Sequence, residues 1–361
     1  MNNKFIKSII LILLISLSFG IYGCNNDKKY TEDEAVFEIH SELQKKFLMG
    51  DYQEISFYAD GQKELSKPEE INIVWEVEKP KKVKEYIFNL SEASDFLETK
   101  TYVTNTNEIA LINLKIHTKY YWYVSYNCEG EEIKTDVKSF YVSTNYPRNL
   151  LIDGLTNVRD IGGYQIGEGK YTNQGLIYRS SRLNENETTD LLITESGIKE
   201  MLDVLKIKSE LDVRQVNDNE NGGITQSPLG ETVSYFSVPM KSGGNCILLN
   251  KDIIKDAFAI LGNQDNYPIV IHCSIGTDRT GMLCFLINAL LGVDEEALYK
   301  DYLFSNFGNI GRNRTPSAIK TYISTISSQS GETFAEKTYN YLLSIDVAEE
   351  DLISVINIMT K

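Results

Sequence analysis

The sequence predicts two domains, an all-β sandwich followed by an α/β domain in which a central sheet is flanked by helices. Up to about residue 145, short runs of alternating apolar and polar residues follow one another with almost no helical pattern between them. From residue 148 on, strand and helix patterns are mixed, and residues 268–292 form one strand, one tight loop and one helix. The expected boundaries are therefore 50–147 for the sandwich and 148–361 for the α/β domain.

Composition and charge exclude one class of partner. The chain of 361 residues has a formal net charge of −15 and an apolar content of 42%, which is enough for packed cores. No nucleic-acid partner is expected, because a phosphate backbone requires basic patches on the protein. Any site for a single phosphate group must therefore be locally basic within an acidic protein.

The first residues have the pattern of an export signal. Lys4 and Lys7 precede an apolar run over 9–17, which is too short to span a membrane comfortably. The segment IYGC that ends at Cys24 resembles the lipobox of bacterial lipoproteins. This resemblance implies that Cys24 carries lipid, including palmitate, and anchors the chain on the extracytoplasmic face of the bacterial cell membrane. An ordinary signal peptide with a fortuitous cysteine is the alternative.

Strand patterns fill the region before the α/β domain. Ile71, Ile73 and Trp75 alternate with polar neighbours, and further runs cover 111–124 and 139–144. Strands spaced in this way are typical of a β-sandwich. Residues 25–49 precede it and are expected to form a tether and a short helix.

Trp75 and the segment LKIHTKY, which ends at Tyr120, resemble a fibronectin type III domain. In that family a tryptophan fills the core and a tyrosine forms a corner of the sandwich. Ile116 stands where the family usually has proline, and a general immunoglobulin-like sandwich is the alternative. Neither version implies chemistry, so the domain is expected to act as a spacer, a docking surface or a lid.

The α/β domain alternates between element types. A pair of glycines marks a turn within 157–164, and 217–228 has the composition of a loop. Strands are expected at 210–214, 234–240 and 268–272, and helices over 189–205, over 252–261, after the loop at 273–279, and from 294 on.

The strand–loop–helix unit at 268–292 contains the chemistry. A loop that joins a strand to a helix N-terminus presents backbone N–H groups to an oxyanion. Cys273 opens this loop and Arg279 closes it. A cysteine in such a place has a lowered pKa and is largely thiolate at neutral pH. The guanidinium matches two oxygens of a phosphate, so the pair predicts a cysteinyl-phosphate intermediate. A buried structural thiol is the alternative.

The run HCSIGTDRTG at 272–281 resembles the HCxxGxxR[ST]G signature of the protein tyrosine phosphatase superfamily. The resemblance implies that Cys273 attacks phosphorus, that Arg279 binds the equatorial oxygens and that Thr280 steadies the leaving thiolate. It also implies a supporting role for His272. The phosphate-binding loop then comprises Ser274, Ile275, Gly276, Thr277, Asp278 and Arg279.

Three further segments resemble one bacterial branch of this superfamily. They are NVRDIGGY at 157–164, GLIYRSSRL at 175–183 and DYLFSN at 301–306. The resemblance covers about residues 148–361. It implies the α/β phosphatase fold, with supporting roles for Arg159, Asp160 and Arg179.

Two aspartates are candidates for the general acid that protonates the leaving group. Asp278 lies in the loop beside Arg279, where the related branch has an aspartate that looks catalytic. Asp212 lies at the end of an expected strand. Asp278 is preferred, although it could serve only to orient Arg279, and Asp212 could pair with Arg214 or Arg179.

One departure from the branch bears on the substrate. Members that act on phosphoinositides have lysine where this chain has Thr277, so we expect a preference for phosphotyrosine-like monoesters, on a protein or a small molecule, over polyphosphorylated lipids. The alternatives are a dual-specificity or phosphoinositide phosphatase and a surface binding lipoprotein with weak catalysis. A sulfurtransferase of the rhodanese type also uses a loop cysteine, but the segments above do not suit it. No metal or cofactor is expected, and the sequence indicates no oligomeric state.

Overall fold

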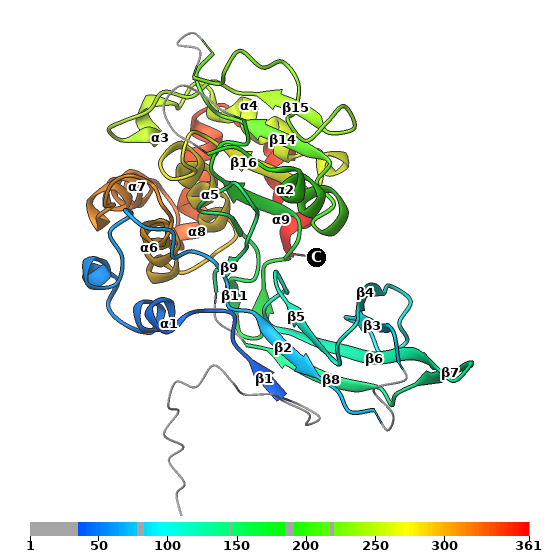
Figure 1. Cartoon of the computed structure of the whole chain (residues 1–361). Helices are drawn as coiled ribbons and strands as arrows, with labels where there is room; N and C mark the ends of the chain where they lie inside the picture. The colour runs from blue at the N-terminus through cyan, green and yellow to red at the C-terminus, as the bar shows by residue number, and fades with distance from the viewer. Residues whose placement is uncertain (1–34, 78–82, 144–145, 185–190, 217–219, 361) are drawn as a thin grey trace, which may run out of the picture.

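The computed structural model describes residues 35–77, 83–143, 146–184, 191–216 and 220–360. Figure 1 shows a β-rich N-terminal region joined to a larger α/β domain. The predicted signal segment, Cys24 and the first part of the tether lie outside the described residues. In the part of the chain that the structure describes, no helix has the length and apolar character needed to cross a bilayer.

The N-terminal region contains two β-sheets (Figure 1). The larger sheet has the order β1 (Ala35–Phe37), β8 (Lys138–Val142), β6 (Thr118–Cys128), β3 (Tyr86–Ser91) and β4 (Lys100–Thr104), with β7 (Glu131–Lys134) also paired to β6. The smaller sheet pairs β2 (Ile71–Val74) with β5 (Glu108–Leu111). The predicted alternation is present in β6, whose Tyr120, Trp122 and Val124 are buried in one core with Trp75.

The sheet of the α/β domain places three strand ends side by side. Its order is β15 (Ser234–Ser237), β14 (Ser209–Asp212), β16 (Ile269–His272), β13 (Ile177–Ser180), β10 (Arg159–Asp160) and β9 (Arg148–Asn149). The first four strands are parallel, and the last two are antiparallel to their neighbours. The ends of β14, β16 and β13 are in register at Asp212, His272 and Ser180. Ligands of parallel sheets bind at this carboxyl edge.

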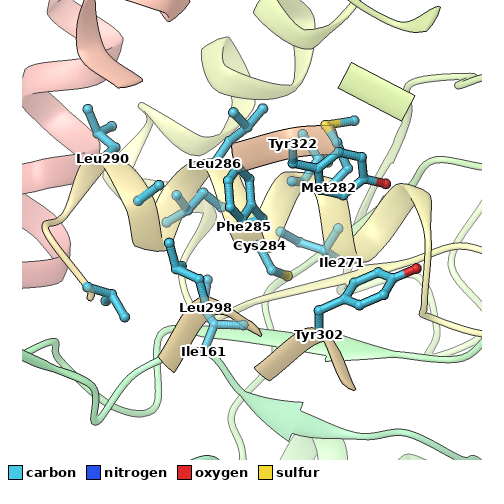
Figure 2. Close-up of a cluster of buried hydrophobic side chains, with 14 of the residues drawn as sticks. Ile161, Ile271, Met282, Cys284, Phe285, Leu286, Leu290, Leu298, Tyr302 and Tyr322 are labelled. Atoms are coloured by element: carbon cyan, nitrogen blue, oxygen red, sulfur yellow. The ribbon is translucent and has the colours of Figure 1, made fainter. Parts of the chain in front are cut away.

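Helix α5 (Arg279–Leu290) is the centre of the domain. All of its residues are buried, as expected for a helix that is apolar on every side. Figure 2 shows Met282, Phe285 and Leu286 of α5 in one cluster with Ile271 of β16 and Tyr322 of α7. The other α-helices and strands are α1 (Glu42–Met49), β11 (Gln165–Gly167), β12 (Lys170–Tyr171), α2 (Glu195–Lys199), α3 (Cys246–Leu249), α4 (Ile254–Leu261), α6 (Glu295–Phe304), α7 (Pro316–Ser327), α8 (Phe334–Ser344) and α9 (Glu349–Thr360).

Most predicted elements of this domain are present with small shifts at their ends. Of the helix expected over 189–205, residues 189–190 lie outside the described residues, and in the described part the helix begins at Glu195 and continues after α2 as a π-helical turn over Glu200–Val204. Gly197 lies inside α2, where a Cβ would lie 2.4 Å from the carbonyl oxygen of Asp153. The glycine therefore serves close packing rather than a turn.

Residues 42–66 pack against the α/β domain, whereas the predicted sandwich begins at residue 50. Helix α1 and the short 3-10 helix after it (Tyr52–Phe57) lie beside α6 in Figure 1. Phe47 and Ile55 are buried in the same core as α5, and the ring of Phe47 lies 5.8 Å from that of Phe307. The segment mixes its few apolar residues with charged ones, so its sequence pattern alone resembles that of a tether.

The two parts of the chain are also joined by Arg148, directly after the predicted boundary. Its guanidinium donates to the carbonyl oxygens of Asn113 at 2.7 Å and Leu114 at 3.0 Å. It also pairs with Asp160 at 2.9 Å. All three partners lie within hydrogen-bond distance of one buried arginine, so the junction is fixed rather than a free linker.

We expect Phe47→Ala to lower the free energy of unfolding of the whole catalytic domain by about 3–5 kcal/mol, because it removes a buried aromatic ring. Chemical denaturation of the chain without its first 24 residues measures this change. Phe57→Ala is the matched control, since that ring is 78% exposed, and its effect should stay within about 0.5 kcal/mol. Equal effects of the two substitutions would show that the segment does not belong to the core.

Candidate active site

The loop 273–279 leaves β16 and enters α5 at the carboxyl edge of the sheet. Its bend requires Gly276, which has φ of +67°. A Cβ at this position would lie 2.3 Å from the carbonyl oxygen of Ser180 at the end of β13. Because any side chain would collide with backbone, the glycine of the HCSIGTDRTG run is a steric requirement.

The carbonyl groups and the N–H groups of the loop differ in their hydrogen bonding. The N–H groups of 274–278 donate no hydrogen bond to the part of the chain that the structure describes. The carbonyl oxygens of residues 274, 275 and 276 accept from Arg182 (backbone N–H, 3.2 Å), Asn157 (Nδ2, 3.1 Å) and Arg179 (Nη2, 2.7 Å), respectively. A set of unpaired N–H groups before a helix N-terminus is a binding site for an oxyanion.

Cys273 has the properties of a nucleophile. Burial raises the pKa of its thiol, but the guanidinium of Arg279 and the hydroxyl and N–H of Thr280 outweigh burial and lower this pKa. The hydroxyl of Thr280 has no other hydrogen-bond partner among the described residues, so it is available to the sulfur. In contrast, burial raises the pKa of Cys284 in α5 to about 11. The pKa values of the two thiols are therefore shifted in opposite directions, and Cys284 serves in packing rather than as a nucleophile.

Arg279 is held by Glu220, a residue that the sequence analysis did not select. The two Nη atoms of Arg279 lie 2.7 Å and 2.5 Å from the carboxylate oxygens of Glu220. Glu220 also accepts from the hydroxyl of Ser274 and from the N–H of Gln215. Burial raises the pKa of Glu220, but Arg279 and Ser274 outweigh burial and lower it to about 2. The carboxylate is thus charged, and it fixes the plane of the guanidinium.

His272 precedes the nucleophile and is fully buried between two carboxylates. Its Nε2 lies 2.8 Å from Glu210 Oε1, and its Nδ1 lies 4.0 Å from Asp212 Oδ1. Burial lowers the pKa of His272, but the charges of Asp212 and Glu210 outweigh burial and raise it. The two carboxylates therefore favour the protonated form of His272.

Asp212, the second candidate acid, belongs to this buried network and does not line the cavity. It accepts from Arg214 Nη2 at 2.7 Å and from the hydroxyl of Tyr235 at 2.9 Å. Burial raises the pKa of Asp212, but His272 and Arg214 outweigh burial and lower it. The ligand atoms of Glu210, Asp212 and His272 lie within 4.8 Å of one another. A metal ion there would meet the guanidinium of Arg214, which already neutralises Asp212, so these residues fit a metal poorly.

Asp278, the preferred candidate acid, does line the cavity. Its carboxylate accepts from Arg314 Nε at 3.0 Å and Nη2 at 2.9 Å, and from the hydroxyl of Tyr302 at 2.9 Å. Arg312 lies farther away, 3.8 Å from Oδ2, with a side chain that is 72% exposed. The aspartate is therefore oriented by α6 and by the loop before α7, rather than by Arg279.

The predicted supporting residues lie in two places. Arg159 and Arg179 both contact Asp301, at 2.9 Å and 2.7 Å, and Arg179 also holds the carbonyl of Gly276. Burial raises the pKa of Asp301, but the two arginines outweigh burial and lower it. This network joins the segments 157–164, 175–183 and 301–306 behind the loop. Asp160, in contrast, lies at the junction with Arg148 and not at the site.

The cavity above the loop has a volume of about 220 Å³. An adjoining cavity of about 240 Å³ shares Asp278, Arg312 and Arg314 with it. The first cavity contains four arginines but only two carboxylates, so it is locally basic within an acidic chain, as predicted. It is lined by Arg182, Glu220, Ser242, Cys273, Ser274, Ile275, Asp278, Arg279, Arg312 and Arg314.

A thiolate and an arginine around an oxyanion cradle define a class of cysteine-dependent phosphatase folds. The profile of the family described as the tyrosine phosphatase family matches residues 150–346, more than half of the chain. The chain therefore belongs to the tyrosine phosphatase family.

Three similar proteins differ in the share of their length that this chain covers. A candidate tyrosine-protein phosphatase of Cupriavidus necator is 25% identical over 192 residues, which cover 46% of this chain and 66% of that protein, slightly under two thirds of its length. The core catalytic domain of the PP-IP phosphatase Siw14 of S. cerevisiae, solved with citrate, is 20% identical with a TM-score of 0.28 over 43% of this chain and 92% of that one. TpbA of P. aeruginosa is 16% identical with a TM-score of 0.25 over 56% of this chain and 97% of that one.

Proposed function

We propose that this protein hydrolyses phosphomonoesters of the phosphotyrosine type through a cysteinyl-phosphate intermediate. The observation that carries the proposal is that Cys273, Arg279 and the loop residues Ser274, Ile275 and Asp278 line one cavity, and that the N–H groups of 274–278 have no hydrogen-bond acceptor among the described residues. The sulfur attacks phosphorus, the S–P bond forms, and the bond from phosphorus to the leaving oxygen breaks. Water then attacks phosphorus, which releases inorganic phosphate and restores the thiolate.

The site residues divide the work of this reaction. The N–H groups of the loop and Arg279 stabilise the equatorial oxygens, and Glu220 keeps the guanidinium in place. Thr280 stabilises the thiolate when it leaves in the second step. We assign the general acid to Asp278, because its carboxyl group lines the cavity and that of Asp212 does not.

The first test is hydrolysis of three substrates by the reduced chain without residues 1–24, in the presence of a chelator. We expect turnover of 4-nitrophenyl phosphate and of a phosphotyrosine peptide that is lost in Cys273→Ser, because the serine hydroxyl is not ionised at neutral pH. Vesicles that contain phosphatidylinositol phosphates form the third arm. Absence of turnover in freshly reduced protein would favour the binding-lipoprotein alternative.

The lipid arm tests the phosphoinositide alternative. Thr277 stands where phosphoinositide-hydrolysing members of the branch have lysine, and its side chain is uncharged and buried. Position 277 therefore adds no positive charge to the site, which supports the preference for phosphotyrosine-like esters. One observation favours the alternative, since the exposed Arg312 supplies a positive charge at the edge of the same cavity. Faster turnover of the lipid than of the peptide would contradict our preference.

The assignment of the acid predicts a dependence on the leaving group. Asp278→Asn should lower kcat on phenyl phosphate by about 10²-fold or more, because phenolate needs a proton as it departs. The loss should be much smaller on 4-nitrophenyl phosphate, whose leaving group is a weaker base. Asp212→Asn is the control and should affect both substrates alike, since its carboxylate lies in the buried network. The reverse pattern would move the role of acid to Asp212.

We also propose that the protein is exported and anchored by lipid at Cys24. The basic start, the apolar run and the segment IYGC support this. Labelled palmitate should be incorporated into the full chain expressed in a bacterium, and Cys24→Ala should abolish the incorporation. A label that persists in the variant would contradict the anchor.

The N-terminal region is proposed to be a fibronectin type III-like spacer. Two observations support this. Strands β3, β6 and β8 share one sheet and β2 and β5 the other, which is the division of strands C, F, G and B, E in an immunoglobulin-like sandwich. The N–H of Lys115 donates to the hydroxyl of Tyr120 at 2.8 Å, as in a tyrosine corner. An experimental structure with other strand connections would contradict the assignment.

A further inference from the structure

We propose that Glu64 is a positioning residue for the active site. It belongs to residues 59–66, here called the clamp segment, which precede the family domain at 150–346. The clamp segment binds the loop 305–314, and that loop supplies Arg312 and Arg314 to the cavity. The inference rests on the proposed phosphatase activity.

The clamp segment and the loop are joined along their backbones. The N–H of Gly61 donates to the carbonyl of Asn306 at 2.8 Å, and the carbonyl of Gly61 accepts from Ile310 at 3.0 Å and Gly311 at 2.9 Å. A Cβ on Gly61 would lie 2.5 Å from the carbonyl oxygen of Arg312. The two segments are thus in backbone contact beside the residues that reach the site.

Glu64 accepts four hydrogen bonds with two carboxylate oxygens. One oxygen accepts from the N–H and the hydroxyl of Ser66. The other accepts from the hydroxyl of Thr156 and, at 3.2 Å, from the N–H of Asn309 in the loop. The hydroxyl of Thr156 also accepts from the N–H of Asn309 at 2.9 Å. Glu64 therefore ties the loop to the segment that opens the family domain.

The first route from this contact leads to the candidate acid. The side chain of Asn306 exchanges two hydrogen bonds with the backbone of Arg314, at 2.7 Å and 2.9 Å. Arg314 holds both carboxylate oxygens of Asp278. Each link between the clamp segment and Asp278 is a hydrogen bond of normal length, so a shift of the loop changes the orientation of the acid.

The second route leads to the phosphate-binding loop. Thr156 exchanges hydrogen bonds with Ser181, and its neighbour Asn157 donates to the carbonyl of Ile275 at 3.1 Å. The second route begins at the carboxylate of Glu64, whereas the first enters the loop at Asn309, which Glu64 binds, and at Asn306, which Gly61 binds. A change at Glu64 should therefore affect protonation of the leaving group first and binding of phosphate second.

The experiment compares Glu64→Gln, Thr156→Val and the double variant, each in the chain without residues 1–24, with Glu70→Gln as control. Glutamine has nearly the shape of glutamate, but at position 64 its NH₂ group would face groups that are themselves donors. Glu70 is a suitable control because its side chain is exposed. We expect kcat on phenyl phosphate to fall by roughly two- to thirtyfold in the first two variants, with a smaller loss on 4-nitrophenyl phosphate. The double variant should lose less than the product of the single losses, because both remove one contact.

A second measurement does not require turnover. Hydrogen exchange of the loop 305–314 and of the N–H groups at 274–278 should be faster in Glu64→Gln than in Glu70→Gln. Equal losses on the two substrates, or unchanged kinetics with unchanged exchange, would overturn the inference and leave the proposed function intact. If the parent protein shows no turnover, the proposed function fails, and faster or unchanged exchange still decides whether Glu64 holds the loop.

Discussion

The site depends on one constraint, which is that the N–H groups of loop residues 274–278 have no acceptor in the part of the chain that the structure describes. A buried donor without a partner costs about 1–3 kcal/mol, so the loop needs strong bonds elsewhere. Three carbonyls of the loop are held by Arg182, Asn157 and Arg179, and Glu220 binds both Arg279 and Ser274. The loop is thus fixed from outside, and its donors remain available to an anion.

Buried charges supply much of this support. Asp301 pairs with Arg159 and Arg179, Asp212 pairs with Arg214, and Glu210 pairs with His272. Isolated charges would be costly in such places, but each of these has a partner of opposite sign within 3 Å. The pKa of the Cys273 thiol is lowered by other groups, namely the guanidinium of Arg279 and the hydroxyl and N–H of Thr280. The buried pairs therefore hold the segments around the loop in place, whereas Arg279 and Thr280 favour the thiolate.

The residues that the sequence could predict are those with local causes. Gly276 is required by a turn, Cys273 and Arg279 by the chemistry of a phosphate, and α5 by its apolar pattern. Glu220 and Arg314 lie in loops and act through contacts with residues 59 and 36 positions away, which no spacing rule indicates. The sequence also did not predict that Phe47 belongs to the core of the α/β domain, because its partner Phe307 is distant in sequence. The separation of Asp212 from the cavity likewise appears only when β14 and β16 are placed side by side.

The long-range contacts change how the domains should be defined. A boundary at residue 148 follows the change from strands to mixed elements, yet the bonds around Gly61 and Glu64 reach the loop that carries Arg314. Phe47 and Ile55 lie in the core that contains α5. The core of the α/β domain therefore includes residues 42–66, which lie in the sequence between strand β1 and strand β2 of the β-rich region. The β-rich region is not joined to the α/β domain by a free linker, because Arg148 binds Asn113 and Leu114 and Gln174 exchanges two hydrogen bonds with the backbone of Ile116.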